Sequence, residues 1–251
     1  MHLNPKQKDA IIHKLGDATV KEFPSQTTTN LSNHFLNKLI HVAGHDLRSP
    51  MFVIRSYSQL LQRTQEKERL EKGLKLISDA TVTMEKTLTS FVQLIDIYTN
   101  PVPTTENLFF NEIFERVKIQ LYNEIKEFQP KFIVDFQTCQ EVQFPSDFLK
   151  EIMLNLFDNS MRHNSERKDL LIKVCTYKEG NRTVLEIADN GNGIEEEKEL
   201  ENIMQPFYSV SDDSNCAGIG LSKVQAIAKV CNGLFEIESS HGFGMKCKFY
   251  F

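Results

Sequence analysis

A histidine and a carboxylate stand side by side near the start of a long helical pattern, in the segment His41-Val42-Ala43-Gly44-His45-Asp46-Leu47-Arg48-Ser49-Pro50. An imidazole can act as a nucleophile, and a neighbouring carboxylate can hold the ring in one tautomer and accept the proton released on attack. His45 and Asp46 are therefore candidate catalytic residues. Ser49 is four residues further on, so on a helix it would lie on the same face as His45.

The residues around His45 predict a helix over about 31–64, with its apolar seam turned away from the histidine. Alternating steps of four and three, typical of a helix bundle, separate its apolar positions. These positions are Leu36, Ile40, Ala43, Leu47, Pro50, Ile54, Tyr57 and Leu61. His45 is expected to face solvent. Pro50 cannot donate a backbone hydrogen bond and is expected to kink the helix one turn beyond the histidine.

A second helix is predicted over about 69–98, after a polar turn at 65–68. Its seam consists of Leu70, Leu74, Ile77, Thr81, Met84, Leu88, Phe91 or Val92, and Ile95. Two amphipathic helices joined by a short turn form an antiparallel hairpin. One hairpin cannot cover both apolar stripes, which favours a homodimeric four-helix bundle through residues 30–99. Alternatively, the hairpin packs on the second domain of its own chain.

Composition limits the class of protein. The 251 residues carry a net charge of −5, which argues against a nucleic-acid partner, and are 40% hydrophobic. No apolar run approaches the roughly 20 residues of a membrane span, and the first residues do not form a signal peptide. The cysteines lack metal-ligand spacing: Cys139, Cys175, Cys216, Cys231 and Cys247. We expect reduced thiols in a soluble cytoplasmic chain, which is either whole or the cytoplasmic part of a longer membrane sensor.

Residues 100–104, which contain two prolines, break the helical pattern and predict a linker, and residues 1–29 predict an N-terminal extension. Residues 105–251 alternate between helix and strand patterns, which predicts an α+β domain with helices on one face of a mixed sheet. The expected helices cover 108–126, 146–163 (with Ser146 as N-cap) and 219–231; the expected strands cover 131–136, 170–177, 182–189, 234–238 and 245–251.

Polar residues on the helix over 146–163 form a candidate metal and phosphate site. Asn155, Asn159 and Arg162 are spaced four and three apart, so they form one stripe beside the apolar face. A carboxamide oxygen is a hard ligand suited to Mg²⁺, and an arginine can reach a phosphate. The alternative is an ordinary solvated polar face.

A second polar motif follows the strand that ends near Ala188. Asp189 stands at the strand end, where its carboxylate can accept a hydrogen bond from an exocyclic amine. Gly191 and Gly193 let the backbone turn tightly and approach a flat ring. By itself the motif is also a common turn sequence.

These motifs together resemble those of sensor histidine kinases. The letters HDLRSP resemble the H-box, and Asn-Leu-Phe-Asp-Asn-Ser-Met-Arg-His from Asn155 resembles the N-box. The turn after Asp189 resembles the G1 box, and Pro206-Phe207-Tyr208 the F-box. Gly218-Ile219-Gly220-Leu221 resembles the G2 box, with Gly242 and Gly244 as the last glycine pair. The resemblance covers about residues 30–251, with the boxes in the family's order.

The resemblance implies a dimerisation and phosphotransfer domain over 30–99 and a gyrase-type ATP-binding domain over 105–251. It implies that His45 is phosphorylated from ATP, that Asp46 takes the proton, and that the phosphoryl group passes to an aspartate on a response regulator. Ser49 would orient water for a reverse, phosphatase reaction. ATP and Mg²⁺ would be bound, with Asn155 and Asn159 on the metal, by Asn155, Asn159, Arg162, Asp189, Gly191, Gly193, Phe207, Gly218, Gly220 and Leu221.

Two other functions remain open at this point. A gyrase-type ATPase needs a glutamate as general base on the metal-binding helix, but Asn155 occupies the corresponding position. A non-catalytic dimeric scaffold that only binds nucleotide is favoured by one feature, because Cys216-Ala217 replaces the usual extra glycine of the G2 box. Nucleotide binding without phosphohistidine would identify the scaffold.

Overall fold

The computed structural model describes residues 44, 47–62, 64, 66–164, 169–194, 202–205, 208 and 218–251. All of them belong to one compact unit, residues 39–251. The predicted N-terminal extension, His45, Asp46 and Phe207 lie outside the described residues, as does the segment 209–217. Within the described residues, no helix is long and apolar enough to cross a membrane.

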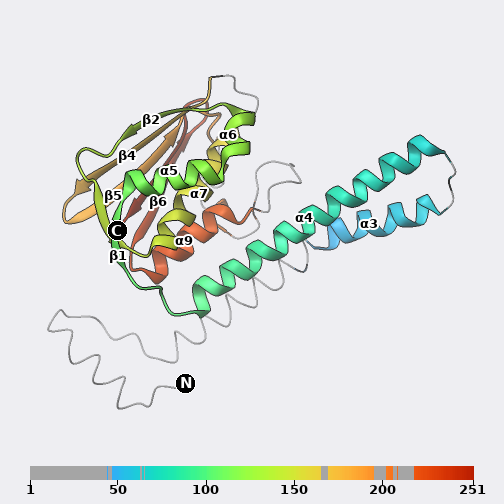
Figure 1. Cartoon of the computed structure of the whole chain (residues 1–251), viewed down its shortest axis with the longest axis horizontal. Coiled ribbons are helices and arrows are strands. Elements are labelled where there is room, and N and C mark those ends of the chain that lie inside the picture. The colour runs from blue at the N-terminus through green and yellow to red at the C-terminus, as the bar shows by residue number, and fades with distance from the viewer. Residues whose placement is uncertain are drawn as a thin grey trace, which may run out of the picture. The chain divides into compact units, whose positions relative to one another are not determined.

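The first described elements form the predicted hairpin. Helices α3 (Arg48–Leu61) and α4 (Lys67–Thr99) pack against each other (Figure 1). The predicted turn at 65–68 is misplaced, because α4 already begins at Lys67. Pro50 is buried in the first turn of α3. Proline is tolerated there, since the first N–H groups of a helix have no partner within the helix.

A glycine allows close contact between the two helices. The buried positions Gly73, Ala80, Thr87 and Leu94 recur every seven residues along α4. A Cβ added at Gly73 would lie 2.6 Å from Leu61 Cδ2, so the backbone of α4 approaches α3 closely at this point. Two leucines of the predicted seam, Leu74 and Leu88, are 58% and 48% exposed in the single chain. Gly73 faces α3, and these leucines lie on the outer surface of the hairpin.

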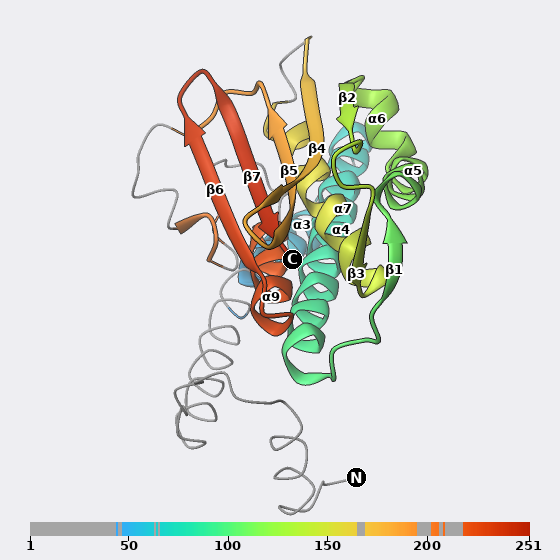
Figure 2. The same cartoon turned by 90° about the vertical axis from the view of Figure 1, so that its left-hand side faces the viewer.

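The rest of the chain folds as a mixed sheet with helices on one face, as predicted (Figure 2). The strand order is β2-β4-β5-β7-β6, in which only β2 and β4 pair in parallel. The strands are β2 (Lys131–Asp135), β4 (Leu171–Glu179), β5 (Arg182–Asp189), β6 (Leu234–Ser240) and β7 (Gly244–Tyr250). The helices are α5 (Phe110–Gln120), α6 (Tyr122–Phe128), α7 (Ser146–Arg162) and α9 (Gly220–Val230).

Three local predictions need correction. The helix expected over 108–126 is divided at Leu121, where the backbone leaves helical geometry with φ −92° and ψ 22°. A small antiparallel sheet of β1 (Glu106–Phe109) and β3 (Glu141–Phe144) was not predicted as a pair, because β3 is too short for a periodic signal. Ser146 is the first residue of α7; its N-cap is Pro145, whose extended backbone ends the preceding segment.

Aromatic side chains fill the core between the helices and the inner face of the sheet. Phe114 of α5 packs edge-on against Phe132 of β2 and Phe157 of α7, with ring centroids 5.6 and 5.8 Å apart. Phe157 is fully buried. Such edge-to-face pairs add to the stabilisation from burial, and here they fix α7 on the sheet. The site residues carried by α7 are thus attached to a rigid layer.

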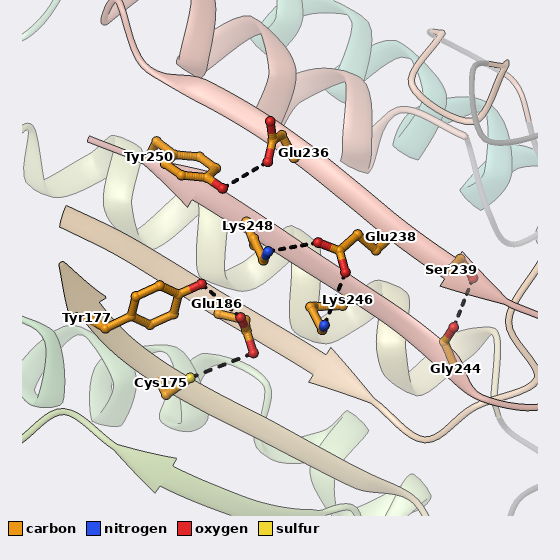
Figure 3. A network of polar contacts seen from close by, with 10 residues as sticks. All are labelled: Cys175, Tyr177, Glu186, Glu236, Glu238, Ser239, Gly244, Lys246, Lys248 and Tyr250. Carbon is orange, nitrogen blue, oxygen red and sulfur yellow. Dashed lines mark hydrogen bonds and ion pairs between the residues drawn. The ribbon is translucent and has the colours of Figure 1, made fainter. Parts of the chain in front are cut away.

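The outer face of the sheet carries cross-strand polar pairs instead of helices (Figure 3). Glu238 of β6 forms ion pairs with Lys248 and Lys246 of β7, at 2.7 and 3.1 Å. Tyr250 donates to Glu236, and Tyr177 to Glu186. A sheet covered on one side shows this division between an apolar and a polar face. Hydrogen bonds from Lys248 and then Lys246 lower the pKa of the Glu238 carboxyl.

We predict that Glu238→Gln lowers stability slightly at neutral pH and not at all in acid. The folded pKa of Glu238 lies below its unfolded value, so its stabilisation is present above the unfolded pKa and is lost as pH falls through the folded pKa. Because the pair is exposed, the expected loss is under about 0.5 kcal/mol. Urea unfolding at pH 7 and at pH 3 measures the free energy of unfolding of both chains. A difference between wild type and Glu238→Gln that is larger at pH 3 than at pH 7 would contradict the prediction.

Candidate functional site

A cavity of about 430 Å³ lies between α7, α9 and the end of β5. Most of the described residues that the sequence singled out line it: Asn155, Asn159, Arg162, Asp189, Gly193, Gly218, Gly220 and Leu221. The structure thus brings together two helices and a strand end that are far apart in the sequence. Ser49 is exposed in the first turn of α3.

Asp189 is held in one orientation at the end of β5. Its Oδ1 accepts hydrogen bonds from the backbone N–H of Gly191 at 2.9 Å and of Met245 at 3.3 Å. Its Oδ2 accepts from the Ser160 hydroxyl at 2.9 Å. The carboxylate is thereby fixed at the cavity wall as an acceptor for a ligand amine. Gly244 makes this possible, because at φ +85° its missing Cβ would lie 2.0 Å from the Asp189 carbonyl oxygen.

Asn164 is a site residue that the sequence analysis missed. It is buried, and its Nδ2 donates to the Ser160 carbonyl oxygen at 2.8 Å. Its Oδ1 accepts from the Asn192 N–H at 2.9 Å. A Cβ at Gly191 would lie 1.8 Å from the Asn164 Oδ1, so glycine is required there for packing. Gly191 therefore supports the loop beneath the cavity by close contact with Asn164 and by donating to Asp189.

The two asparagines of α7 present their side chains along one wall. Asn155 Nδ2 donates to the Glu151 carbonyl oxygen at 2.7 Å and to Glu151 Oε1 at 2.9 Å. Its Oδ1 faces the start of α9, since a Cβ at Gly220 would lie 3.2 Å from it. Asn159 Nδ2 contacts Met245 Sδ at 3.7 Å. Carboxamide oxygens on this wall are of the type that Mg²⁺ accepts as ligands.

Arg162 completes the wall in an ion pair. Its Nε lies 2.6 Å from Asp158 Oδ1, one turn earlier on α7. The pair is partly buried and holds the guanidinium at the cavity wall. The positive group therefore lies where the sequence placed it, but with a carboxylate beside it that the sequence analysis did not assign.

The start of α9 supplies an anion-binding position. Gly218 adopts φ +61°, α9 begins at Gly220, and its N-cap residue Ile219 makes no side-chain capping bond. Backbone N–H groups at a helix start are unpaired within the helix, and the helix dipole favours negative charge there. This helix end opens on the same cavity as Asn155 and Asp189. The site therefore combines an acceptor for an amine, amide oxygens for a cation and donors for an anion.

Other residues on the cavity wall were not predicted from the sequence. Lys86 and Ser90 come from α4 and Lys223 from α9, whereas Tyr208, which also lines the cavity, belongs to the segment that resembles the F-box. Helical periodicity could not identify Lys86 or Lys223, because each is one of many lysines. Among the described residues there is no cluster of three or more His, Cys, Asp or Glu side chains that could hold a metal ion. A metal here would depend on amide oxygens and on the ligand's own phosphates.

Known proteins have sequences similar to that of this chain. The family described as histidine kinase-, DNA gyrase B- and HSP90-like ATPase matches residues 145–251. The methanogenesis regulatory histidine kinase FilI of Methanothrix harundinacea is 27% identical over 84% of this chain. The sensor histidine kinase YclK of Bacillus subtilis is 28% identical over 81% of it. Over most of its length, the chain is therefore similar to sensor histidine kinases. It spans only 24% of FilI and 44% of YclK.

Solved structures of histidine kinases share the fold of this chain. Histidine kinase ThkA, in a complex with response regulator protein TrrA, superposes with a TM-score of 0.68 at 17% identity. That match covers 93% of this chain and 67% of the other. Acinetobacter baumannii histidine kinase AdeS gives a TM-score of 0.61 at 18% identity, covering 82% of this chain and 96% of the other. The likeness includes the hairpin as well as the sheet domain, since it extends well beyond residues 145–251.

Proposed function

We propose that this chain is an ATP-dependent histidine autokinase that phosphorylates its own His45. The observation that carries the proposal is the cavity, which gathers Asp189, the two asparagines of α7 and the start of α9 in one site. The hairpin that continues from the His45-Asp46 segment supplies the second half of the argument. The similarity to sensor histidine kinases supports both.

In the proposed complex, each part of ATP meets a suitable group. Asp189 accepts from the adenine amine, and Gly193 lets the backbone approach the ring at φ +66°. Gly218, Gly220 and the start of α9 receive the phosphates. Asn155 and Asn159 would hold Mg²⁺, which supplies neutralisation of phosphate charge when it is bound. Arg162, Leu221 and Phe207 complete the proposed set.

The chemical step is phosphoryl transfer to a nitrogen of the His45 ring. A bond forms between this nitrogen and the γ-phosphorus, the bond from the γ-phosphorus to the bridging oxygen breaks, and ADP leaves. Asp46 accepts the ring proton. Positioning and electrostatic stabilisation account for most of the rate in such reactions. The nucleotide domain must therefore bring the γ-phosphate to the hairpin.

The proposed second step passes the phosphoryl group to an aspartate on a response regulator. Support comes from ThkA, whose structure was solved with response regulator protein TrrA. In the reverse, phosphatase reaction, Ser49 would orient water. Ser49 is exposed at the start of α3, where a docked partner or water can reach it.

We further propose that residues 30–99 form the dimerisation and phosphotransfer domain and residues 105–251 the ATP-binding domain. The chain between them, from Pro101 to Thr105, forms neither helix nor strand. Large apolar side chains on the outer surface of the hairpin remain exposed in the single chain: Met51, Phe52, Leu60, Leu74, Val82, Leu88 and Val92. A second hairpin would cover them in a homodimeric four-helix bundle. The proposed location is the cytoplasm, where ATP and a response regulator are available.

Two alternative functions can be distinguished from that of an autokinase. A gyrase-type ATPase would need a general base at the position of Asn155, whose amide cannot accept a proton from water. The neighbouring carboxylate of Glu151 is engaged by Asn155 and Lys223. A nucleotide-binding scaffold would retain the cavity but form no phosphohistidine.

Incubation with γ-labelled ATP and Mg²⁺ tests the proposal. The wild-type chain is expected to acquire label that is lost in acid and kept in alkali, as a phosphoramidate is. Nucleotide binding without such label would overturn the autokinase and establish the scaffold. Release of labelled phosphate without any labelled protein would instead support the ATPase.

A further inference from the structure

A buried lysine beside the nucleotide cavity has no role in the function proposed above. Lys223 of α9 is only 6% exposed. Its Nζ lies 2.9 Å from Glu151 Oε1 on α7 and donates to Gln93 Oε1 on α4 at 2.6 Å. Lysine is rarely buried unless it is paired, because desolvation of the ammonium is costly. The cost is met here by partners from two other helices.

Glu151 connects this lysine to a candidate metal ligand. The same Oε1 that accepts from Lys223 also accepts from Asn155 Nδ2, at 2.9 Å. The Glu151 carbonyl oxygen accepts from the same Nδ2 at 2.7 Å. Both neighbours of the Asn155 amide nitrogen are therefore acceptors. A flipped amide would bring its oxygen against two acceptors, so only one orientation satisfies the contacts.

That orientation directs the Asn155 oxygen toward the cavity. A Cβ at Gly220 would lie 3.2 Å from the oxygen, which places it beside the anion-binding start of α9. A cation held there would lie between an amide oxygen and bound phosphates. The Glu151 carboxylate stays with Asn155 because the Lys223 ammonium holds it; its side chain is 27% exposed and could otherwise turn to solvent.

We propose that Lys223 is a positioning residue that acts through Glu151 to present the Asn155 carboxamide oxygen to the Mg²⁺ of bound ATP. The inference rests on the proposed function and deepens it. Residues that orient a metal ligand from behind affect metal affinity although they do not touch the metal. Lys223 is therefore expected to control how much Mg²⁺ tightens nucleotide binding, with little effect on binding of metal-free ATP.

The test uses the full chain and isothermal titration calorimetry with ATP, in excess Mg²⁺ and in EDTA. The measured quantity is the ratio of the two dissociation constants. Lys223→Met keeps the length of the side chain and removes the charge. It is expected to reduce the Mg²⁺-dependent gain about 10-fold, while the affinity in EDTA stays within about 2-fold of wild type. An unchanged gain in a folded Lys223→Met chain would overturn the inference.

A double variant keeps the test decisive if Lys223→Met does not fold. Glu151→Gln with Lys223→Met removes the uncompensated carboxylate and retains a side-chain carbonyl oxygen that can accept from Asn155 Nδ2. Its Mg²⁺-dependent gain is expected to recover to within about 3-fold of wild type. A folded double variant whose gain stays as low as that of Asn155→Ala would count against positioning through Glu151.

Two reference variants separate the inference from the function on which it rests. Gln93→Met removes the contact with α4 but leaves the Lys223–Glu151 pair, so the Mg²⁺-dependent gain should persist; its loss would assign the effect to helix docking and overturn the inference. Asn155→Ala should abolish the gain. If Asn155→Ala binds like wild type, the proposed metal role of Asn155 fails. If Asn155→Ala loses the Mg²⁺-dependent gain but Lys223→Met keeps it, only the inference about Lys223 fails.

Discussion

A His45→Gln chain is expected to bind Mg²⁺-ATP with wild-type affinity and to lose all acid-labile label. Glutamine retains a polar side chain of similar reach, but its amide nitrogen is not nucleophilic, so no nitrogen–phosphorus bond can form. We expect labelling to fall by at least about 1000-fold, to the background of the assay, as it does when the nucleophile of a covalent step is removed. Labelling with γ-labelled ATP and calorimetry on the same preparations measure both quantities.

His41→Gln is the matched control for His45→Gln. It makes the same substitution four residues earlier in the same predicted helix. This variant should label like wild type, because the resemblance to the H-box assigns the phosphoacceptor to His45. Equal labelling of wild type and His45→Gln would show that the acceptor is another residue, and His41 or His34 would then be tested next. Loss of ATP binding in His45→Gln would also contradict the prediction, since the nucleotide cavity is formed by other elements.

The parts of the fold that could be predicted are those in which one segment carries its own signal. The strand predicted over 182–189 is β5, and the predicted polar stripe of Asn155, Asn159 and Arg162 on α7 lies on one wall of the cavity. The predicted end of the helical pattern at Asn100 coincides with the end of α4 at Thr99. In each case, backbone geometry and local polarity suffice to specify the feature.

The parts that could not be predicted depend on contacts between distant segments. Lys223 and Gln93 are 130 residues apart, and no periodicity relates them. The close approach of α4 to α3 at Gly73 was also not predicted, because the seam was read from large apolar residues such as Leu74. Gly73 lies directly against Leu61 of α3, since a residue without a Cβ allows the helices to approach closely. Burial in a helix pair depends on the partner's shape as well as on hydrophobicity.

Asp189→Asn is expected to weaken ATP binding about 100-fold, or about 2.8 kcal/mol, while the fold is retained. The asparagine oxygen can still accept from the N–H groups of Gly191 and Met245. The Ser160 hydroxyl can rotate to accept from the new amide N–H₂ in place of donating to Asp189 Oδ2. In the proposed complex, however, the adenine amine would meet another donor in place of a carboxylate. Calorimetry with Mg²⁺-ATP measures the loss.

A nucleotide analogue shows whether the lost contact is the one to adenine. Purine riboside triphosphate lacks the exocyclic amine, so it should bind the wild-type chain more weakly than ATP does and should bind Asp189→Asn about as well as ATP does. Glu186→Gln is the matched control, because it makes the same carboxylate-to-amide change on β5 but on the outer face of the sheet, beside Tyr177 (Figure 3). It should leave both affinities unchanged. If Asp189→Asn still prefers ATP over the analogue as strongly as wild type does, another group recognises the amine. Asp189 would then serve to hold Gly191 and Met245 in place and would not read the base.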